Sequence, residues 1–220
     1  MSTRSYGQFC GFARALEVVG ERWALMIIRD LLVGPKRFSD LHRGLPGIPT
    51  NVLTQRLKEL EEGGVVQRTV LARPDRGVAY ELTPYGLELQ DVVFALGRWG
   101  AKNLDAPREG ETITVDSVIT AMRTTFTPEA ARNVRATFEL RMGPVTVHVG
   151  VDHGKLDVVQ GPANGADLVI EAGSQLKALM AGEMTPADAV KSGAVRVHGN
   201  RRLLATFAEI FRVGKKPVPT

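Results

Sequence analysis

The sequence predicts two domains: a mainly α-helical domain of the winged helix-turn-helix class, followed by an α+β domain in which helices cover one sheet. Helix-spaced apolar residues and a basic hairpin pattern follow one another over residues 23–89. A short polar stretch with proline and glycine then interrupts the pattern at residues 105–112. Strands of alternating polarity come after it. A chain of 220 residues exceeds the usual length of one domain, and its apolar content suffices for two cores.

Two helices before the base-reading element are predicted from an apolar run and a basic pair. Residues 23–32 are apolar nearly all round, which is typical of a core helix. Gly34 and Pro35 end this helix. Lys36 and Arg37 stand where the next helix begins, and a helix N-terminus is a favourable place to hold a phosphate. We therefore expect both cations to contact DNA.

The next helix, predicted from residue 50 to residue 62, has the composition of a base-reading element. Thr50 suits an N-cap, and two glycines at 63 and 64 supply a left-handed stop. At about 100° per residue, three leucines share one side of this helix and polar residues share the other. Asn and Gln pair with adenine edges and Lys with guanine or phosphate, so the polar side suits a major groove. The residues of this side are Thr50, Asn51, Thr54, Gln55 and Lys58, and the leucines are Leu53, Leu57 and Leu60.

Arg56 lies beside the apolar side on the same helical wheel. For Arg56 we expect a phosphate contact or a structural ion pair before a base contact. The alternative for the whole polar side is an ordinary solvated surface. The elements around this helix favour DNA binding.

A β-hairpin follows, with strand patterns at residues 65–70 and 78–83 and a Pro-Asp-Arg-Gly turn between them. Its basic tip carries Arg73 and Arg76. A hairpin of this kind is a wing, which contacts phosphates while an adjoining helix lies in the major groove. The residues expected on the inward face of the hairpin are Val66, Val70, Val78, Tyr80 and Leu82.

Four motifs in this order resemble the HxlR-type winged-helix transcriptional regulators of bacteria. They are VGERW at 19–23, GPKRFSDL at 34–41, LTQRLKEL at 53–60 and YELTPYG at 80–86. The resemblance covers about the first hundred residues. It implies a homodimer that binds a pseudo-palindromic operator on double-stranded DNA, with DNA contacts from residues 50–58 and from Arg73 and Arg76.

The resemblance also implies that residues 9–19 and 84–103 form the dimer contact. Independently, the helix predicted after Thr83 and Pro84 has apolar residues on more than one side, so that one side can pack on its own domain and another needs a partner. A helix buried on two sides within one chain is the alternative. The apolar residues are Leu87, Leu89, Val92, Val93, Phe94, Leu96 and Trp99.

Cys10 is the single cysteine, which excludes an intrachain disulfide and a multi-cysteine metal site. Members of the HxlR family often carry a cysteine about thirteen residues before the tryptophan of the first motif, and some sense oxidants or electrophiles through it. The resemblance thus makes Cys10 a candidate redox sensor. The favoured alternative is a small apolar filler in the first helix, because no Lys or His lies nearby in sequence to lower the thiol pKa.

The net charge and the sequence motifs limit the other classes of function that the chain could have. The net charge of +4 divides as 14 Lys+Arg minus 11 Asp+Glu over residues 1–104, against 14 minus 13 over residues 105–220, so the small excess lies in the N-terminal half. No apolar run has membrane-spanning length and no secretion signal is recognisable, so we expect a cytoplasmic protein without membrane contact. The four histidines lack metal-ligand spacing, and no nucleophile-elbow or phosphate-loop pattern occurs. We expect no metal, no cofactor and no enzymatic activity.

The second half is predicted as an α+β layer. A helix at residues 116–125 precedes strands at 134–142, 145–149, 155–159 and 166–172. Two short helices follow at 174–181 and 186–191, then a strand at 194–198 and a helix that is capped by Asn200 and ends near Phe211.

This half resembles the sterol carrier protein fold, in its type-2-like group of lipid-binding domains. The residues concerned are GADLVI at 165–170, LMAGEMTPADA at 179–189 and VRVHGN at 195–200. The resemblance implies an apolar ligand pocket between sheet and helices. The same residues forming a solid core is the alternative. The candidate pocket residues are Phe126, Phe138, Leu179, Met180, Met184, Leu204, Phe207 and Phe211.

We therefore predict a winged helix-turn-helix DNA-binding and dimerisation domain over residues 1–104, a linker at 105–112 and a sterol-carrier-like domain over 113–216. The predicted protein is a homodimeric transcriptional regulator modulated by a small apolar or amphipathic ligand. In one alternative the C-terminal domain is only a structural or interaction module. In another the protein is a lipid carrier with vestigial DNA binding.

Overall fold

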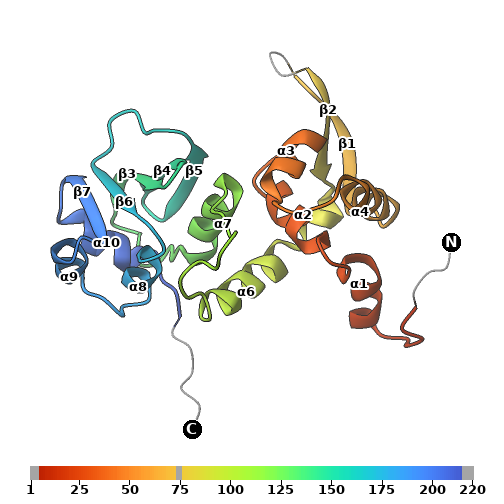
Figure 1. The fold of residues 1–220 in the computed structure, drawn as a ribbon, viewed down its shortest axis with the longest axis horizontal. Coiled ribbons are helices and arrows are strands. Elements are labelled where there is room, and N and C mark those ends of the chain that lie inside the picture. The colour runs from red at the N-terminus through yellow and green to blue at the C-terminus, as the bar shows by residue number, and fades with distance from the viewer. Residues whose placement is uncertain (1–4, 73–75, 215–220) are drawn as a thin grey trace, which may run out of the picture. The chain divides into compact units, whose positions relative to one another are not determined.

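The computed structural model describes residues 5–72 and 76–214. The chain divides into two compact units, residues 1–93 and residues 94–220, and the division falls inside helix α6 (Gln90–Ala101) (Figure 1). The predicted linker at residues 105–112 belongs to a stretch, residues 102–114, that contains no helix or strand.

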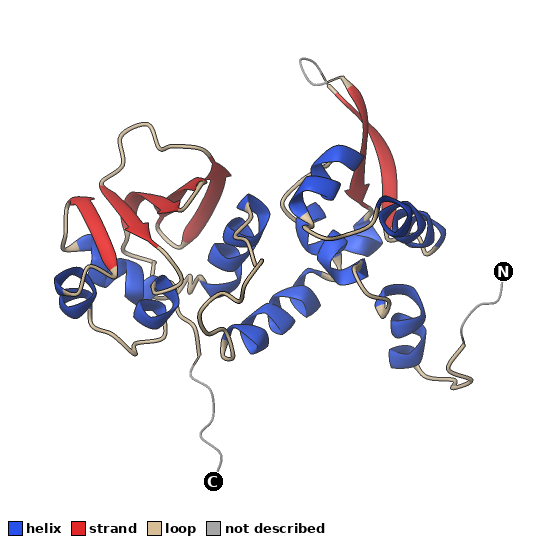
Figure 2. Cartoon of the chain, in the orientation of Figure 1, coloured by secondary structure: helices blue, strands red, loops and turns tan. Residues whose placement is uncertain are grey.

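The first unit consists of helices with a two-stranded antiparallel sheet that extends away from them (Figures 1 and 2). Its core is made by fully buried side chains from the second to the fourth helix, among them Ile27, Ile28 and Leu41. This is the predicted winged helix-turn-helix. Its elements are α1 (Gly11–Val19), α2 (Ala24–Leu31), α3 (Phe38–Gly44), α4 (Thr50–Glu62), β1 (Val66–Leu71), β2 (Gly77–Leu82) and α5 (Pro84–Leu87), followed by the start of α6.

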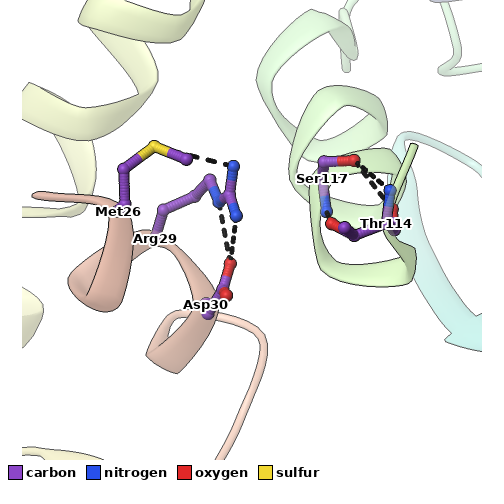
Figure 3. Close-up of polar contacts among 5 residues, drawn as sticks. All are labelled: Met26, Arg29, Asp30, Thr114 and Ser117. Carbon is purple, nitrogen blue, oxygen red and sulfur yellow. Dashed lines mark hydrogen bonds and ion pairs between the residues drawn. The ribbon is translucent and has the colours of Figure 1, made fainter. Parts of the chain in front are cut away.

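Helix α2 is a core helix that also carries a buried charge. Asp30 is 0% exposed, and the neighbouring Arg29 donates to it from Nε to Oδ1 over 2.8 Å (Figure 3). The Arg29 Nη1 group also lies 3.8 Å from the Sδ atom of Met26. A carboxylate in a protein interior requires such pairing, because an isolated buried charge is costly. The pair lets Asp30 stay in the core.

Helix α4 is oriented by its apolar side. Leu53, Leu57 and Leu60 are at most 1% exposed, as predicted. The helix begins one position earlier than a Thr50 cap would give, because Pro49 is the N-cap and Thr50 is already helical. Gly64, with φ of 70°, provides the left-handed residue that ends the helix.

The hairpin corrects one sequence prediction. Val66 and Leu82 are paired and buried at its base. Val70 and Val78 are also paired, but they are 78% and 57% exposed, so their assignment to an inward face was wrong. The far half of the hairpin extends beyond the helices (Figure 2), and these two side chains lie there. Near the base, Ala79 on the opposite face is fully buried instead.

The predicted helix over residues 84–103 is two helices. Thr83 caps α5 by accepting a hydrogen bond from the Gly86 N–H over 3.0 Å. The N–H groups of Glu88 and Leu89 then bond to carbonyls three residues back, which tightens the chain and ends α5 before α6 begins. Gly86 is required here, because a Cβ atom would lie 2.1 Å from the Val65 carbonyl oxygen.

The second unit contains the predicted α+β layer, and its elements agree with the predicted ones within a few residues. The last helix begins at Leu203 rather than at an Asn200 cap, although the Asn200 side chain accepts a hydrogen bond from the Arg202 N–H. After the end of α6, the elements are α7 (Val115–Thr125), β3 (Arg135–Met142), β4 (Val145–Asp152), β5 (Lys155–Gln160), β6 (Leu168–Ala172), α8 (Leu176–Met180), α9 (Pro186–Lys191), β7 (Val195–Gly199) and α10 (Leu203–Ile210).

Helix α7 begins with a reciprocal cap. The Ser117 N–H donates to the Thr114 Oγ1 atom over 3.3 Å, and the Thr114 N–H donates to the Ser117 Oγ atom over 3.1 Å (Figure 3). These two bonds satisfy backbone donors that a helix start leaves without intrahelical partners.

The sheet has the strand order β5-β4-β3-β6-β7, in which β3 and β6 run parallel and the other neighbours run antiparallel. Its apolar face packs against helices, with α7 on β4 and β5 and α9 on β7. The opposite face is polar and carries Glu139, Arg141 and Glu171. The predicted fold class is confirmed.

Three phenylalanines fill the centre of the second core. The ring centroids of Phe138 and Phe207 are 5.3 Å apart, and those of Phe207 and Phe211 are 4.7 Å apart. All three side chains are fully buried. Aromatic pairs at such separations contribute beyond the area that they bury.

We expect Phe207→Ala to lower the free energy of unfolding by about 3–5 kcal/mol, because it removes the ring that contacts both partners and leaves a cavity. Urea unfolding followed by circular dichroism measures this. Val159→Ala is the control, since Val159 is 42% exposed and its truncation is expected to cost little. Equal small losses in both variants would contradict the packed aromatic centre.

Candidate nucleic-acid interface

The exposed side of α4 presents the residues predicted to read bases. Asn51, Thr54, Gln55 and Lys58 are all exposed, opposite the buried leucines. Gln55 donates to Glu59 over 2.7 Å, and Lys58 lies 3.7 Å from Glu62. Exposed pairs of this spacing within one helix are worth only about 0.3–0.5 kcal/mol, so a base edge competes with them easily. This side can therefore offer both donors and acceptors to a groove.

The first residue of α4, Thr50, is also exposed. Its hydroxyl lies 3.4 Å from the His42 Nε2 atom on α3. The two helices of the helix-turn-helix thus meet at the end of α4 that would enter a groove first.

Arg56 occupies a different environment from the other predicted DNA contacts. Its side chain is 16% exposed and forms ion pairs with Glu59 of the same helix and, at 3.5 Å, with Glu21 between α1 and α2. The geometry supports the ion-pair alternative for Arg56. Its guanidinium connects α4 to the preceding α1–α2 connection.

The start of α3 is connected to the wing. The Arg37 N–H donates to the Asp40 Oδ2 atom over 3.1 Å, and the Arg37 Nη2 group donates to the Arg76 carbonyl oxygen over 3.0 Å. Lys36 and Tyr80 exchange two backbone hydrogen bonds of 2.9 and 2.7 Å. Lys36, Arg37 and Arg76 are thereby brought together, as a phosphate-contacting group requires. Arg73, the other predicted wing cation, lies outside the described residues.

Two further exposed cations were missed by sequence reasoning. Arg68 on β1 lies 5.7 Å from the Tyr80 ring and pairs with Glu61 at 3.0 Å, which raises the pKa of its guanidinium. Arg43, in the last turn of α3, is 79% exposed and lies 3.7 Å from Asp40. The position of Arg43, just before the turn that leads to α4, could have identified it from the sequence as a candidate DNA contact. For Arg68 the pattern gave no signal, because a cation in a strand is common on any solvated face.

Comparison with known proteins matches a family model to each half of the chain. The model of the HxlR-like helix-turn-helix family matches residues 18–108. YtcD of Bacillus subtilis, an uncharacterized HTH-type transcriptional regulator, is 41% identical over 90 residues, which are 41% of this chain and 71% of YtcD. The chain belongs to the HxlR-like helix-turn-helix family.

Another relative is Rv3095 of Mycobacterium tuberculosis, also an uncharacterized HTH-type transcriptional regulator. It is 40% identical over 107 residues, which are 49% of this chain and 66% of Rv3095. Among solved structures, the oxidized form of the redox regulator HypR is 34% identical, covers 44% of this chain and 100% of its own, and has a TM-score of 0.41. The model of the SCP-2 sterol transfer family matches residues 121–212. The chain thus combines an HxlR-like domain with an SCP-2-like domain.

The helices that flank the HxlR-like reader carry exposed apolar side chains. In α6, Val93 is buried while Val92, Leu96 and Trp99 are 49%, 47% and 67% exposed. Next to α1, Phe9 is fully exposed, and Phe12 within it is 73% exposed. Among the described residues, α1 and α6 thus each combine a buried position with exposed apolar side chains.

Cys10 corrects a second sequence expectation. It is the N-cap of α1 and is exposed, so it does not act as an apolar filler. The backbone N–H groups of Ala13 and Phe12 lower the pKa of the Cys10 thiol. These N–H groups belong to the first turn of α1, where backbone donors favour the charged thiolate over the neutral thiol. Sequence reasoning considered neighbouring cations and not the helix start.

The predicted ligand-pocket residues of the SCP-2-like domain are mostly core. Phe138, Leu179, Leu204, Phe207 and Phe211 are at most 1% exposed, and Met180 is 6% exposed. Phe126 and Met184 are half-buried, and the Phe126 ring lies 5.5 Å from that of Phe211. The rings pack on one another, which supports the solid-core alternative for this group.

Two hollows of the second unit have other linings. The first, of about 380 Å³, lies over the polar edge of the sheet and includes Arg135, Lys155 and three aspartates at 152, 157 and 167. The second, of about 320 Å³, is the Trp99 hollow. It is lined by Ala95, Arg98, Trp99, Ala101, Lys102, Thr125, Arg212, Val213 and Gly214.

Two features, a metal-binding cluster and a membrane-spanning helix, are absent from the described residues. Within residues 5–72 and 76–214, there is no group of three or more His, Cys, Asp or Glu side chains that could hold a metal ion. Nor do these residues include a helix with the length and apolarity of a membrane span.

We expect alkylation of Cys10 by iodoacetamide to report its lowered pKa, because the thiolate is the reactive form. The rate is expected to reach half its plateau at a lower pH in the folded chain than in the chain unfolded in urea, and to fall as the pH drops through the folded-state pKa. Mass spectrometry measures the modification, and the signal comes only from Cys10. The same midpoint in both states would disprove an effect of the helix start on the thiol.

Proposed function

We propose that the chain is a homodimeric, sequence-specific DNA-binding transcriptional regulator. The observation that carries the proposal is the exposed polar side of α4 beside a wing that is bonded, through Arg76 and Tyr80, to the residues that precede α3. Family membership supports DNA binding, because the HxlR-like relatives are HTH-type transcriptional regulators. Such a role requires access to the chromosome and hence a cytoplasmic location.

In this proposal, two sets of residues have different tasks. Thr50, Asn51, Thr54, Gln55 and Lys58 face the major groove and read base edges. The second set contacts phosphates, which positions the protein and carries little sequence information. It consists of Lys36, Arg37, Arg73 and Arg76, while Arg56 holds α4 in place.

The dimer is proposed to form through the exposed apolar sides of α1 and α6. Leu96 and Val92 supply apolar area that a single chain leaves in water, and its burial is favourable at about 25 cal/mol per Å². A two-fold axis would place the two α4 helices about 34 Å apart on one face of the duplex. The operator would then be pseudo-palindromic.

A ligand of the SCP-2-like domain is proposed to bias operator affinity. The bias requires different ligand affinities for the DNA-competent and DNA-incompetent dimers, a coupling typically of about 1–3 kcal/mol. The packed rings of Phe138, Phe207 and Phe211 favour the alternative of a filled module for the sheet–helix core itself. A lipid carrier with vestigial DNA binding would instead bind DNA weakly, with strong salt dependence and no sequence preference.

The proposal is tested first by fluorescence anisotropy with DNA from upstream of the protein's own gene and with scrambled DNA at the same moderate salt. We expect preference for the upstream DNA with two chains per site. If neither DNA is preferred, selection of bound fragments from the whole genome follows. Absence of any preferred fragment would reject sequence-specific binding.

The roles within the reader are separable by substitution. On the preferred DNA, Gln55→Ala and Lys58→Ala are each expected to cost about 1–3 kcal/mol and to reduce the preference over scrambled DNA. Arg76→Ala is expected to weaken both DNAs alike and to reduce the salt dependence. Lys191→Ala, in the SCP-2-like domain, is the matched control with no expected effect. Equal losses on both DNAs for Gln55 and Arg76 variants would contradict the assigned roles.

The dimer contact is tested by Leu96→Glu. Because Leu96 is 47% exposed in the single chain, a charge there is expected to leave the fold intact and to shift the protein from dimer to monomer in sedimentation equilibrium. Val159→Glu places the same charge on an exposed valine of the sheet and is expected to leave the dimer unchanged. A Leu96→Glu protein that dimerises as well as the unsubstituted chain would exclude α6 from the contact.

A further inference from the structure

The Trp99 hollow has a lining unlike the rest of the second unit. Its charged residues are Arg98, Lys102 and Arg212, and it includes no carboxylate. The hollow over the sheet, by contrast, balances two cations with three aspartates. Among the described residues, none of the three cations of the Trp99 hollow forms an ion pair. The hollow is therefore an uncompensated positive site.

An aromatic side chain stands beside these charges. Trp99 is 67% exposed, and alanines at 95 and 101 and Val213 add small apolar surface. Tryptophan offers a flat face on which an aromatic ring stacks with an offset. A flat apolar body with an acidic group is thus the chemistry that this lining complements.

The walls of the hollow are held by packing and backbone bonds. Gly97 lets α6 approach α7 closely, since a Cβ atom there would lie 3.3 Å from the Thr124 Cγ2 atom. The Arg212 N–H donates to the Thr125 carbonyl over 2.8 Å, and the Val213 N–H donates to the Met180 carbonyl over 3.1 Å. These contacts fix the backbone from which Arg98, Lys102 and Arg212 line the same hollow.

We propose that the Trp99 hollow binds a small aromatic carboxylate. The carboxylate pairs with Arg212 and Lys102, because charge-assisted hydrogen bonds from Arg and Lys to carboxylates are short and strong. The ring lies against Trp99. At about 320 Å³ the hollow is at the lower end of ligand-pocket volumes, which suits one or two rings rather than a long-chain lipid.

The site has a regulatory consequence that rests on the proposed function. Trp99 and Arg98 belong to α6, the helix whose exposed Leu96 and Val92 are proposed to form the dimer contact. A ligand held between α6 and residues 212–214 contacts the proposed dimer helix. If α6 has different positions in the DNA-competent and DNA-incompetent dimers, the ligand binds the two with different affinities. This difference is what an effector of operator affinity requires.

Binding is tested on the full chain without DNA, by calorimetric titration with 2-naphthoate and with its neutral isostere 2-naphthamide. We expect one naphthoate per chain, accompanied by a change in tryptophan fluorescence, and at least about tenfold weaker binding of the amide. Absence of saturable naphthoate binding at millimolar concentration would overturn the proposal. So would equal affinities for the acid and the amide, and neither comparison depends on a variant that must fold.

Location is tested by paired charge removal. Lys102→Met and Arg212→Gln are each expected to weaken naphthoate binding by about tenfold. Lys155→Met and Arg135→Gln make the same changes at the hollow over the sheet and are expected to leave the affinity unchanged. Equal losses at both hollows would show only general attraction of an anion to a basic protein and would overturn the assignment.

The consequence is measured separately, as the operator affinity with and without saturating naphthoate. A changed affinity that disappears with Lys102→Met supports regulation through this site. An unchanged operator affinity, with naphthoate bound, would refute the regulatory consequence while leaving both the site and DNA binding in place. A chain that binds naphthoate but prefers no DNA sequence even without naphthoate would refute the proposed function while leaving the site in place.

Discussion

Burial of one side of α4 is the constraint on which the candidate DNA interface depends. Leu53, Leu57 and Leu60 cannot leave the core without exposing three leucines, each worth about 1.5–3 kcal/mol. Their burial sets the rotation of the helix about its axis and turns the polar side to solvent. The end of the same helix also places the wing, because the Thr83 hydroxyl donates to the Gly64 carbonyl over 2.6 Å and the Thr83 N–H to the Val65 carbonyl over 3.0 Å. Reader and wing therefore share one junction.

Periodicity predicted those features that depend on one helix or one strand. The leucine spacing of α4 and the alternation of β3 require no knowledge of neighbours, and both were predicted correctly. Val70 and Val78 were not, because alternation tells which side chains share a face but not how far the helices extend to cover it. The prediction for Cys10 was wrong for a related reason. The environment of Cys10 depends on the residue at which α1 begins, and the helix begins one residue after it, which makes Cys10 an exposed N-cap.

The C-terminal half shows a different limit of sequence reasoning. Phe138, Phe207 and Phe211 have the spacing that either a core or an apolar pocket would give, since both put the same faces toward the interior. Only the ring separations distinguish them, and separations of 4.7 and 5.3 Å are those of packed rings. The SCP-2 resemblance described the fold correctly, but fold does not decide whether a cavity exists. The Trp99 hollow was not foreseen, because its lining joins the end of α6 to residues more than a hundred positions later.

The two candidate ligand locations differ in what a ligand must displace. Entry into the aromatic core would force side chains from their packed positions, and overpacking a core typically costs about 1–3 kcal/mol. That cost would weaken binding of a ligand in the core. The Trp99 hollow demands no repacking of the core, and it relieves repulsion among three cations that have no counter-ion in the described structure. Because α6 both walls this hollow and carries Leu96 on its exposed side, binding energy gained there acts on the proposed dimer helix directly. The proposed effector would therefore lie beside the proposed dimer helix rather than within the packed aromatic core of the SCP-2-like domain.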